Sequence, residues 1–392
     1  MEFVMLSKIF KQFLQLESSS GILLIVATLM STVIVNTSAY EWYQSFFNTM
    51  IAIKIGNFNI EKPLLLWIND GFMSIFFFLV GLELKREFMI GELKDKKIAM
   101  LPLICAIGGM IVPSVIYYLV NRNDAYALTG WAIPMATDIA LVLGVLALLG
   151  NRVSNSLRIF LLAIAIFDDL GAILIIALFY TSKLSLSSLS IAGAAIMVLS
   201  LFNWRRVTSV APYLLVGLVL WAAFLKSGVH ATLSGVVLAF FIPLKSSIKD
   251  DISESPLEKL EHDLHPAVAY GILPLFAFAN TGISLSGFSL DAFIHPITLG
   301  VFLGLFVGKP VGILLFAWIA IKLKFAKLPL EVSVRQVVGI SILCGIGLTM
   351  SLFISTLAFE HTDSNHFIYD RLGIILGSLF SGLFGFLLLR SK

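Results

Sequence analysis

Residues 158–180 read RIFLLAIAIFDDLGAILIIALFY. Between Ile159 and Phe179 the only polar side chains are those of Asp168 and Asp169. Since about 20 apolar residues cross a bilayer, this stretch predicts a membrane-spanning helix with two carboxylates near its centre. A charge at that depth costs roughly 2.5–3.5 kcal/mol, so we expect the two aspartates to have a function.

The composition of the chain agrees with a membrane protein. Of its 392 residues 58% are hydrophobic and only 13% are charged, and the mean hydropathy is +0.97. This leaves too little polar surface for a water-soluble protein, so we expect a lipid bilayer around the chain. The net charge of +3 gives no reason to expect binding to nucleic acid. The two cysteines, Cys105 and Cys344, lie in apolar runs and predict no disulfide framework.

About twelve apolar stretches are long enough to be spans or parts of spans, which predicts an all-helical polytopic membrane protein. We expect residues 1–392 to form a single transmembrane domain. Most of the 27 lysines and arginines fall in loops on one side, so the positive-inside rule places both termini in the cytoplasm. The predicted spans lie at residues 14–35, 64–84, 99–120, 126–149, 157–180, 187–202, 209–225, 229–243, 264–284, 296–321, 336–358 and 372–389.

One loop on the predicted outside has a regular pattern of its own. The sequence IAIKIGNFNI, from Ile51 to Ile60, alternates apolar and polar residues on both sides of Gly56 and Asn57. This pattern is typical of a β-hairpin with a two-residue turn. A lone two-stranded hairpin is only marginally stable in water, so we expect it to pair with a partner, such as its copy in a second subunit.

Two further charges lie near the middle of other spans. Asp138 is the only charge in residues 125–150, and Lys309 is the only one in residues 297–321. A simple structural ion pair explains Lys309 and one aspartate but leaves the other acids unexplained. Because adjacent residues of a helix point about 100° apart, we expect one of Asp168 and Asp169 to pair with Lys309 and the other to face water.

The other carboxylate suits a hard cation. A carboxylate can hold either a proton or a hard cation such as Na⁺ or Li⁺, but not both at once, and oxygen ligands suit such cations. We therefore expect proton and cation to compete for this pair.

Two spans contain helix-breaking residues in corresponding positions. Residues 129–144, TGWAIPMATDIALVLG, combine Gly and Pro with the polar pair Thr137 and Asp138. Residues 340–354, ISILCGIGLTMSLFI, carry Gly345 and Gly347 at their centre. Paired broken helices predict inverted repeats and a binding site where the breaks cross. At such a crossing Asp138 is suited to the amide ends and Lys309 to the carbonyl ends of the half-helices.

These residues and several longer motifs resemble the NhaA-type family of bacterial sodium/proton antiporters. The resemblance extends in consistent order along nearly the whole chain. The motifs are WINDGFMSIFFFLVGLELKRE, PMATDIALVLGVLALLG, FLLAIAIFDDLGAI, LEHDLHPAVAYGILPLFAFAN, GLFVGKPVGI and GIGLTMSLFI.

The resemblance implies a twelve-helix electrogenic transporter of the bacterial inner membrane, which exports Na⁺ or Li⁺ and imports protons. By motif, Asp168 and Asp169 are the carboxylates that bind the transported Na⁺ and the protons, and Asp169 is the main cation ligand. Lys309 pairs with Asp168, and Thr137 with Asp138 belongs to the crossing of the broken helices. The family also forms homodimers through an outside hairpin, which corresponds here to residues 51–60.

A pH-responsive region is implied as well. By resemblance it comprises charged residues at the end of the second span and others before the ninth: Glu83, Arg86, Glu87, Glu261, His262 and His265. A histidine titrates near neutral pH and suits a switch, although loop histidines also titrate without regulating anything. This chain departs from the family in having Glu258 where well-known members carry a basic residue, so no pH profile is carried over. His230 is shared with the family, and we expect it to be modulatory at most.

Other functions fit the sequence less well. A cation channel would use the same acids, but a fixed Lys309 in a cation path opposes conduction. An intramembrane aspartyl protease needs its two aspartates on different helices, whereas Asp168 and Asp169 are adjacent. We therefore expect no enzymatic activity and no cofactor. A proton- or sodium-coupled solute symporter stays open as the alternative to Na⁺/H⁺ antiport by alternating access.

Overall fold

The computed structural model describes residues 19–56, 58–181, 184–244, 255–284, 289–326, 332–359 and 367–391. Apart from one two-stranded sheet, the regular elements in these ranges are helical, which confirms the predicted fold class. Seven helices in this part of the chain are long and apolar enough to cross a membrane, and up to nine if each of two bent pairs is one span. A helical element lies at each predicted span position.

The helices group into two compact units. The described parts of Met1–Thr37, Lys96–Ala172 and Asn280–Lys392 form the first unit, and those of Ser38–Asp95 and Ile173–Ala279 form the second. Both units are assembled from segments that are distant in the sequence. The assignment of residues 1–392 to one domain stays a prediction.

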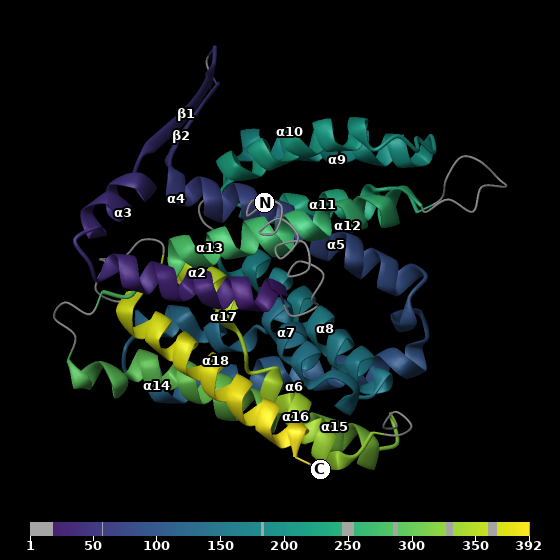
Figure 1. Ribbon diagram of the computed structural model, residues 1–392. Helices are drawn as coiled ribbons and strands as arrows, with labels where there is room; N and C mark the ends of the chain where they lie inside the picture. Colours follow the sequence, from purple (N-terminus) through teal and green to yellow (C-terminus); the bar gives the residue numbers. More distant parts are fainter. Residues whose placement is uncertain are drawn as a thin grey trace, which may run out of the picture. The chain divides into compact units, whose positions relative to one another are not determined.

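The first unit contains the residues singled out as ion-binding. Its elements are α2 (Ser19–Val35), α6 (Lys96–Asn121), η3 (Ala127–Met135), α7 (Ile139–Leu149), η4 (Gly150–Arg152), most of α8 (Asn155–Phe179), η6 (Leu290–Phe293), α14 (Pro296–Leu303), η7 (Gly304–Gly308), α15 (Lys309–Lys322), α16 (Val334–Leu343), α17 (Leu348–Ala358) and α18 (Phe367–Arg390). Helix α18 contacts both α14 and α16, as Figure 1 also shows.

Close packing of α6 on α15 positions the start of α15. A Cβ on Gly108 would collide with the carbonyl oxygen of Gly312, and a Cβ on Gly312 would collide with that of Gly108. Small residues allow this close approach of two backbones, as is common between membrane helices. Lys309, one turn before Gly312, is thereby held at a fixed depth against α6.

The second unit contains the hairpin and a second bundle of helices. Its elements are α3 (Tyr40–Phe47), β1 (Met50–Ile55), β2 (Phe58–Pro63), α4 (Leu64–Leu66), η1 (Trp67–Phe72), α5 (Met73–Met89), η2 (Glu92–Lys94), the end of α8, α9 (Leu186–Trp204), α10 (Ala211–Ser227), α11 (Leu233–Phe241), α12 (Pro256–Ala267), η5 (Val268–Ile272) and α13 (Leu273–Asn280). Its hydrophobic core includes Phe78 of α5, Leu199 of α9, Tyr213 of α10 and Leu238 of α11.

The predicted hairpin is present and is slightly longer than predicted. Strands β1 and β2 pair antiparallel from Met50 opposite Pro63 to Ile55 opposite Phe58. Gly56 in the turn has φ +58°, a backbone conformation that favours glycine, while Asn57 lies outside the described residues. Figure 1 shows the hairpin as an extended arm that projects beyond α3 and α4.

Candidate functional site

The first predicted break interrupts the span formed by η3 and α7. The 3₁₀-helical segment η3 ends at Met135, after Pro134, and α7 starts only at Ile139. Between them the backbone is extended, with φ −86° and ψ 151° at Ala136. Pro134 lies inside η3 and has no amide hydrogen, so it removes one helical hydrogen bond just before the segment ends.

The second predicted break separates α16 from α17. Helix α16 ends at Leu343, α17 starts at Leu348, and the two axes are bent by 45°. A Cβ on Gly345 would collide with the carbonyl oxygen of Leu305 and the hydroxyl of Ser381. A Cβ on Gly347 would lie 2.9 Å from the carbonyl oxygen of Ala136. Both glycines are therefore required for close packing at the break.

The two breaks contact each other directly. The main-chain amide of Asp138 donates to the carbonyl oxygen of Ile346 at 2.7 Å. The hydroxyl of Thr137 lies 3.0 Å from the carbonyl oxygen of Cys344, to which it can donate. Residues of one break thus form hydrogen bonds with main-chain groups of the other that have no partner within their own helix. The two broken spans cross at this point.

Asp138 caps the amino-terminal ends of two helices with one carboxylate. Its Oδ1 accepts a hydrogen bond from the amide of Leu141 at 3.1 Å, in the first turn of α7. Its Oδ2 accepts from the amide of Thr349 at 2.9 Å and from the Thr349 hydroxyl at 2.6 Å, in the first turn of α17. A helix start carries partial positive charge, so one buried carboxylate compensates both half-helices.

Lys309 serves the opposite helix end and also forms the predicted ion pair. It follows the π-helical segment η7 and is fully buried. Its Nζ lies 2.7 Å from Oδ2 of Asp168, and it donates to the carbonyl oxygen of Met135, the last residue of η3. Both side chains of the ion pair have 0% of their surface exposed. Lys309 therefore joins the carboxylate of α8 to the carbonyl end of the first broken span.

The Asp168 carboxylate keeps acceptor capacity after this pairing. Its Oδ2 also lies 2.7 Å from the hydroxyl of Thr137, whose single proton is shared with the carbonyl oxygen of Cys344. Its Oδ1 has no hydrogen-bond partner among the described residues. Asp169 follows on the same helix and is 1% exposed. The arrangement brings Asp168, Lys309, Thr137 and the two breaks together, with oxygen atoms of the kind that hard cations prefer.

The residues predicted for pH response are brought together in the second unit. Arg86 donates from Nε to both carboxylate oxygens of Glu261, at 3.1 and 2.9 Å, and pairs with Glu87 at 2.7 Å. A cavity of about 560 Å³ is lined by Arg86, Glu261, His262 and His265 together with Glu258 and Pro266. Glu83, on α5, has Glu261, Arg86 and Glu87 as its electrostatic neighbours.

Glu258, the departure from the family pattern, has a structural partner. Its carboxylate accepts from the amide of Ser255 at 2.9 Å, and the Ser255 hydroxyl accepts from the amide of Glu258 at 3.2 Å. This reciprocal pair is a capping box at the start of α12. His230, in the same unit, contacts the carbonyl oxygen of Tyr180 through its ring Nε2.

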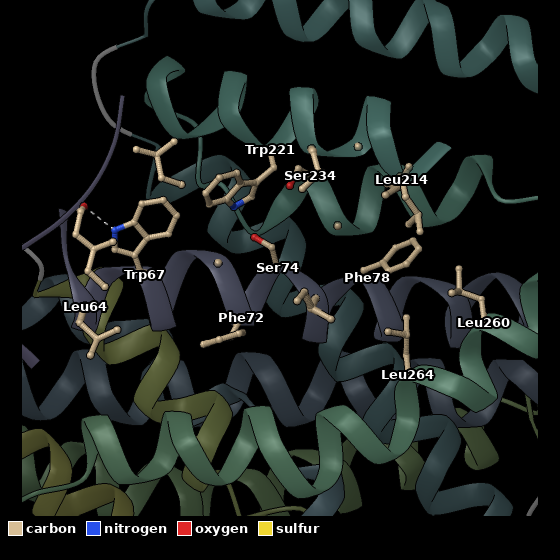
Figure 2. Close-up of a pocket in the computed structure, with 18 residues that line it drawn as sticks. Leu64, Trp67, Phe72, Ser74, Phe78, Leu214, Trp221, Ser234, Leu260 and Leu264 are labelled. Carbon is tan, nitrogen blue, oxygen red and sulfur yellow. Dashed lines mark hydrogen bonds between the residues drawn. The ribbon is translucent and has the colours of Figure 1, made fainter. Parts of the chain in front are cut away.

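A larger cavity of about 840 Å³ lies in the second unit but does not suit ions. Figure 2 shows that aromatic and aliphatic side chains line it, among them Trp67, Phe78 and Trp221. The two indoles donate to the carbonyl oxygens of Ile51 and Asp70, each at 3.1 Å. None of the described residues that line this cavity has a charged side chain.

Two features of the ion site were not predicted from the sequence. The first is Thr349, which donates to Asp138. It lies two residues after Gly347, in the first turn of α17, where a polar side chain can reach a neighbouring helix end. The carbonyl oxygens of Met135 and Cys344 also contribute, at the ends of the two interrupted segments. Every residue has a main-chain carbonyl, so its residue type does not show whether that carbonyl lines a site. Only the predicted breaks in the helices could have indicated these two oxygens.

Comparison with known proteins gives a consistent result. A family model described as "Na+/H+ antiporter 1" matches residues 11–389. The Na(+)/H(+) antiporter NhaA of Psychrobacter cryohalolentis is 54% identical over 381 residues, covering 97% of this chain and 94% of that protein. That of Yersinia pseudotuberculosis serotype O:3 is 53% identical over 385 residues, covering 98% and 97%.

Among solved structures, that of the sodium proton antiporter MjNhaP1 from Methanocaldococcus jannaschii at pH 8 matches with a TM-score of 0.52. The match covers 99% of this chain and 96% of that one at 17% sequence identity. At this low identity the similarity concerns the fold alone.

Proposed function

The chain belongs to the Na⁺/H⁺ antiporter 1 family, and from this premise we propose that it is an electrogenic antiporter in which Na⁺ or Li⁺ and protons compete for Asp168 and Asp169. It is a multi-pass membrane protein and a Na⁺/H⁺ antiporter, as its relatives are.

The observation that carries the proposal is the fully buried ion pair of Lys309 with Asp168, next to Asp169. A buried charge pair is a weak source of stability, so the pair has another use. The Asp168 carboxylate keeps a free acceptor oxygen, and Asp169 adds a second carboxylate. In our proposal Asp169 is the main cation ligand, and the arrival of a cation releases the protons that the carboxylates hold.

Electrogenic exchange requires that more positive charge enters with protons than leaves with the cation. The site offers more than one group that can carry a proton for each Na⁺ bound, namely the two carboxylates and Lys309. The broken helices allow the site to open alternately to each side, because their extended segments are held by a few hydrogen bonds and not by continuous helical bonding. No cofactor is needed in this mechanism, and no enzymatic activity is proposed.

Location, regulation and assembly follow the family expectation. We place the protein in the bacterial inner membrane with both termini in the cytoplasm, on the basis of the positive-inside rule. The cluster of Arg86, Glu261, His262 and His265 is proposed to set the pH response. The hairpin is proposed to join two copies, since Met50, Ile51 and Ile53 expose 56%, 38% and 43% of their surface. Salt tolerance of the cell is the expected physiological result.

The experiment that tests this function uses the purified protein in liposomes. Addition of Na⁺ or Li⁺ on one side, with no organic solute present, is expected to move protons across the membrane. A dye that reports membrane potential is expected to show charge movement in the same preparation. Proton movement that required an organic solute would favour a solute symporter and overturn the proposal, and exchange without a change in potential would overturn the electrogenic part.

A further inference from the structure

Three arginines lie together at one end of the first unit, where segments distant in the sequence meet. Arg152 ends η4, Arg335 lies in the first turn of α16, and Arg390 ends α18. All three line one cavity of about 510 Å³. We call these three residues the arginine cluster.

The described contacts of the arginine cluster hold its guanidinium groups at the cavity. Arg152 donates to the carbonyl oxygen of Arg390 at 2.8 Å, and Arg335 donates to the hydroxyl of Ser391. The guanidinium of Arg390 lies 5.9 Å from the ring centre of Phe386. None of the described residues that line the cavity is acidic.

The start of α16 adds to the positive character of this cavity. Ser333 and Gln336, which form the capping box of α16, both line it. A helix start carries partial positive charge and attracts anions. The end of α18 carries the opposite partial charge, and the bond from Arg152 to the Arg390 carbonyl offsets it. Arg152 thus caps the end of α18 at the same cavity as the start of α16.

The rest of the lining is apolar, because Leu388 and Leu389 also contribute. Planar guanidinium groups bind phosphate through paired hydrogen bonds, and the leucines suit a hydrocarbon chain. Helix α18 is long and apolar enough to span the membrane, so its end lies near the boundary between lipid and water. Basic pockets between membrane helices on the cytoplasmic side bind anionic lipid headgroups.

We propose that the arginine cluster binds the phosphate of an anionic phospholipid headgroup in the cytoplasmic leaflet, with an acyl chain along Leu388 and Leu389. The choice of leaflet rests on the proposed orientation of the chain. Bound lipid would hold the start of α16 against the end of α18. Helix α16 leads directly to the break at Cys344, so the lipid would stabilise the first half of the second broken span.

The test uses the full-length protein in neutral detergent with three additions: phosphatidylglycerol, phosphatidylcholine or inorganic phosphate. The variants are Arg335→Gln, Arg390→Gln and Arg390→Lys. The matched control is Arg122→Gln, which removes an exposed arginine that follows α6 in the same unit and does not line the cavity. The two readouts are the melting temperature and the bound lipid counted by native mass spectrometry. Neither readout depends on ion transport.

Phosphatidylglycerol is expected to raise the melting temperature of the wild type and of Arg122→Gln. Each Gln variant is expected to need about tenfold more of this lipid for the same effect, because it loses charge-assisted bonds to phosphate. Arg390→Lys keeps the charge but not the paired geometry and should lie between them. Equal responses of wild type and Gln variants, or an equal effect of phosphatidylcholine, would overturn the proposal. If only inorganic phosphate stabilised the protein, the bound phosphate would not come from a lipid, and the proposal would be wrong.

Discussion

Asp138 and Thr349 are joined by two hydrogen bonds to a single carboxylate oxygen, one from the Thr349 amide at 2.9 Å and one from its hydroxyl at 2.6 Å. Both residues are buried, with 1% and 2% of their surface exposed. The amide bond belongs to the backbone and survives substitution, whereas the hydroxyl bond depends on the side chain. Thr349 is therefore a positioning residue for the crossing, and its two contributions can be separated by mutation.

Thr349→Val is expected to lower the exchange rate about tenfold, since a bond to a charged acceptor is worth about 1.5–3 kcal/mol. Thr349→Ser keeps the hydroxyl and should restore most of the rate. The matched control is Thr356→Val on the same helix, because the Thr356 hydroxyl donates to the nearby Phe353 carbonyl at 2.8 Å. Exchange in liposomes checks the prediction. Equal rates for the Val and Ser variants of Thr349 would contradict it.

Removal of the Lys309 charge should destabilise the protein. Lys309→Ala leaves the buried Asp168 without its ion-pair partner, which costs about 3–5 kcal/mol when a buried pair is broken. Lys309→Arg keeps the charge and should be milder. Lys322→Ala is the control, because Lys322 ends the same helix and stacks on the Trp318 ring 4.5 Å away. A melting temperature of Lys309→Ala equal to the wild-type value would contradict the prediction.

The two central aspartates should differ in what they contribute. Asp169→Asn is expected to abolish cation binding and exchange, since the amide cannot carry the charge that balances Na⁺. Asp168→Asn should also damage transport, with a lower melting temperature because Lys309 loses its partner. Asp370→Asn serves as a control, as Asp370 is a buried acid that accepts from Ser355 elsewhere in the same unit. Undiminished exchange by Asp169→Asn would disprove the assignment of the main ligand.

Substitutions of Glu258 can separate the effect of its negative charge from the effect of its capping bond to Ser255. Glu258→Gln can keep the capping box with Ser255 while it removes a negative charge from the cavity that contains His262 and His265. Less negative charge makes protonation in this cavity less favourable, so the pH profile of exchange should move to lower pH. Glu258→Lys should move it further and also lose the cap.

The control for Glu258 is Glu41→Gln, an equal change of charge on the exposed face of α3. Profiles of exchange against pH, recorded for all four proteins, provide the measurement. They should include the interval from about pH 5 to 8, in which a histidine changes its charge. If Glu258→Gln and Glu41→Gln gave the wild-type profile alike, the cavity would have no part in pH regulation.

The sequence predicted the centre of the site because charge is rare within spans. Asp168 and Lys309 each interrupt an apolar run, and the structure places them 2.7 Å apart. Thr349 was not predictable in this way. A hydroxyl in an apolar span usually bonds its own helix, as that of Thr356 does, and only the crossing of distant segments turns Thr349 towards Asp138. The capping role of Glu258 was predictable, because Ser255 and Glu258 have the spacing of a capping box.

The last prediction concerns competition at the aspartate pair. If a proton and Na⁺ share the carboxylates of Asp168 and Asp169, each bound proton must leave before Na⁺ binds. The Na⁺ concentration for half-maximal exchange should then rise about tenfold for each unit of pH lowered, wherever the shared site is protonated. A carboxylate that carries a proton has lost the negative charge that balances Na⁺, so the two ions exclude each other at the shared group.

The measurement is the half-saturating Na⁺ concentration in liposomes across the pH range of activity, with the maximal rate determined at saturating Na⁺. Shared binding predicts that the half-saturating concentration changes with pH. A change of the maximal rate at saturating Na⁺ would instead report the proposed pH-responsive cluster. Asp370→Asn should behave as the wild type, since its carboxylate lies outside the site. A half-saturating concentration that stayed constant over the whole range would mean that protons and Na⁺ bind at separate groups, and the competitive mechanism would be wrong.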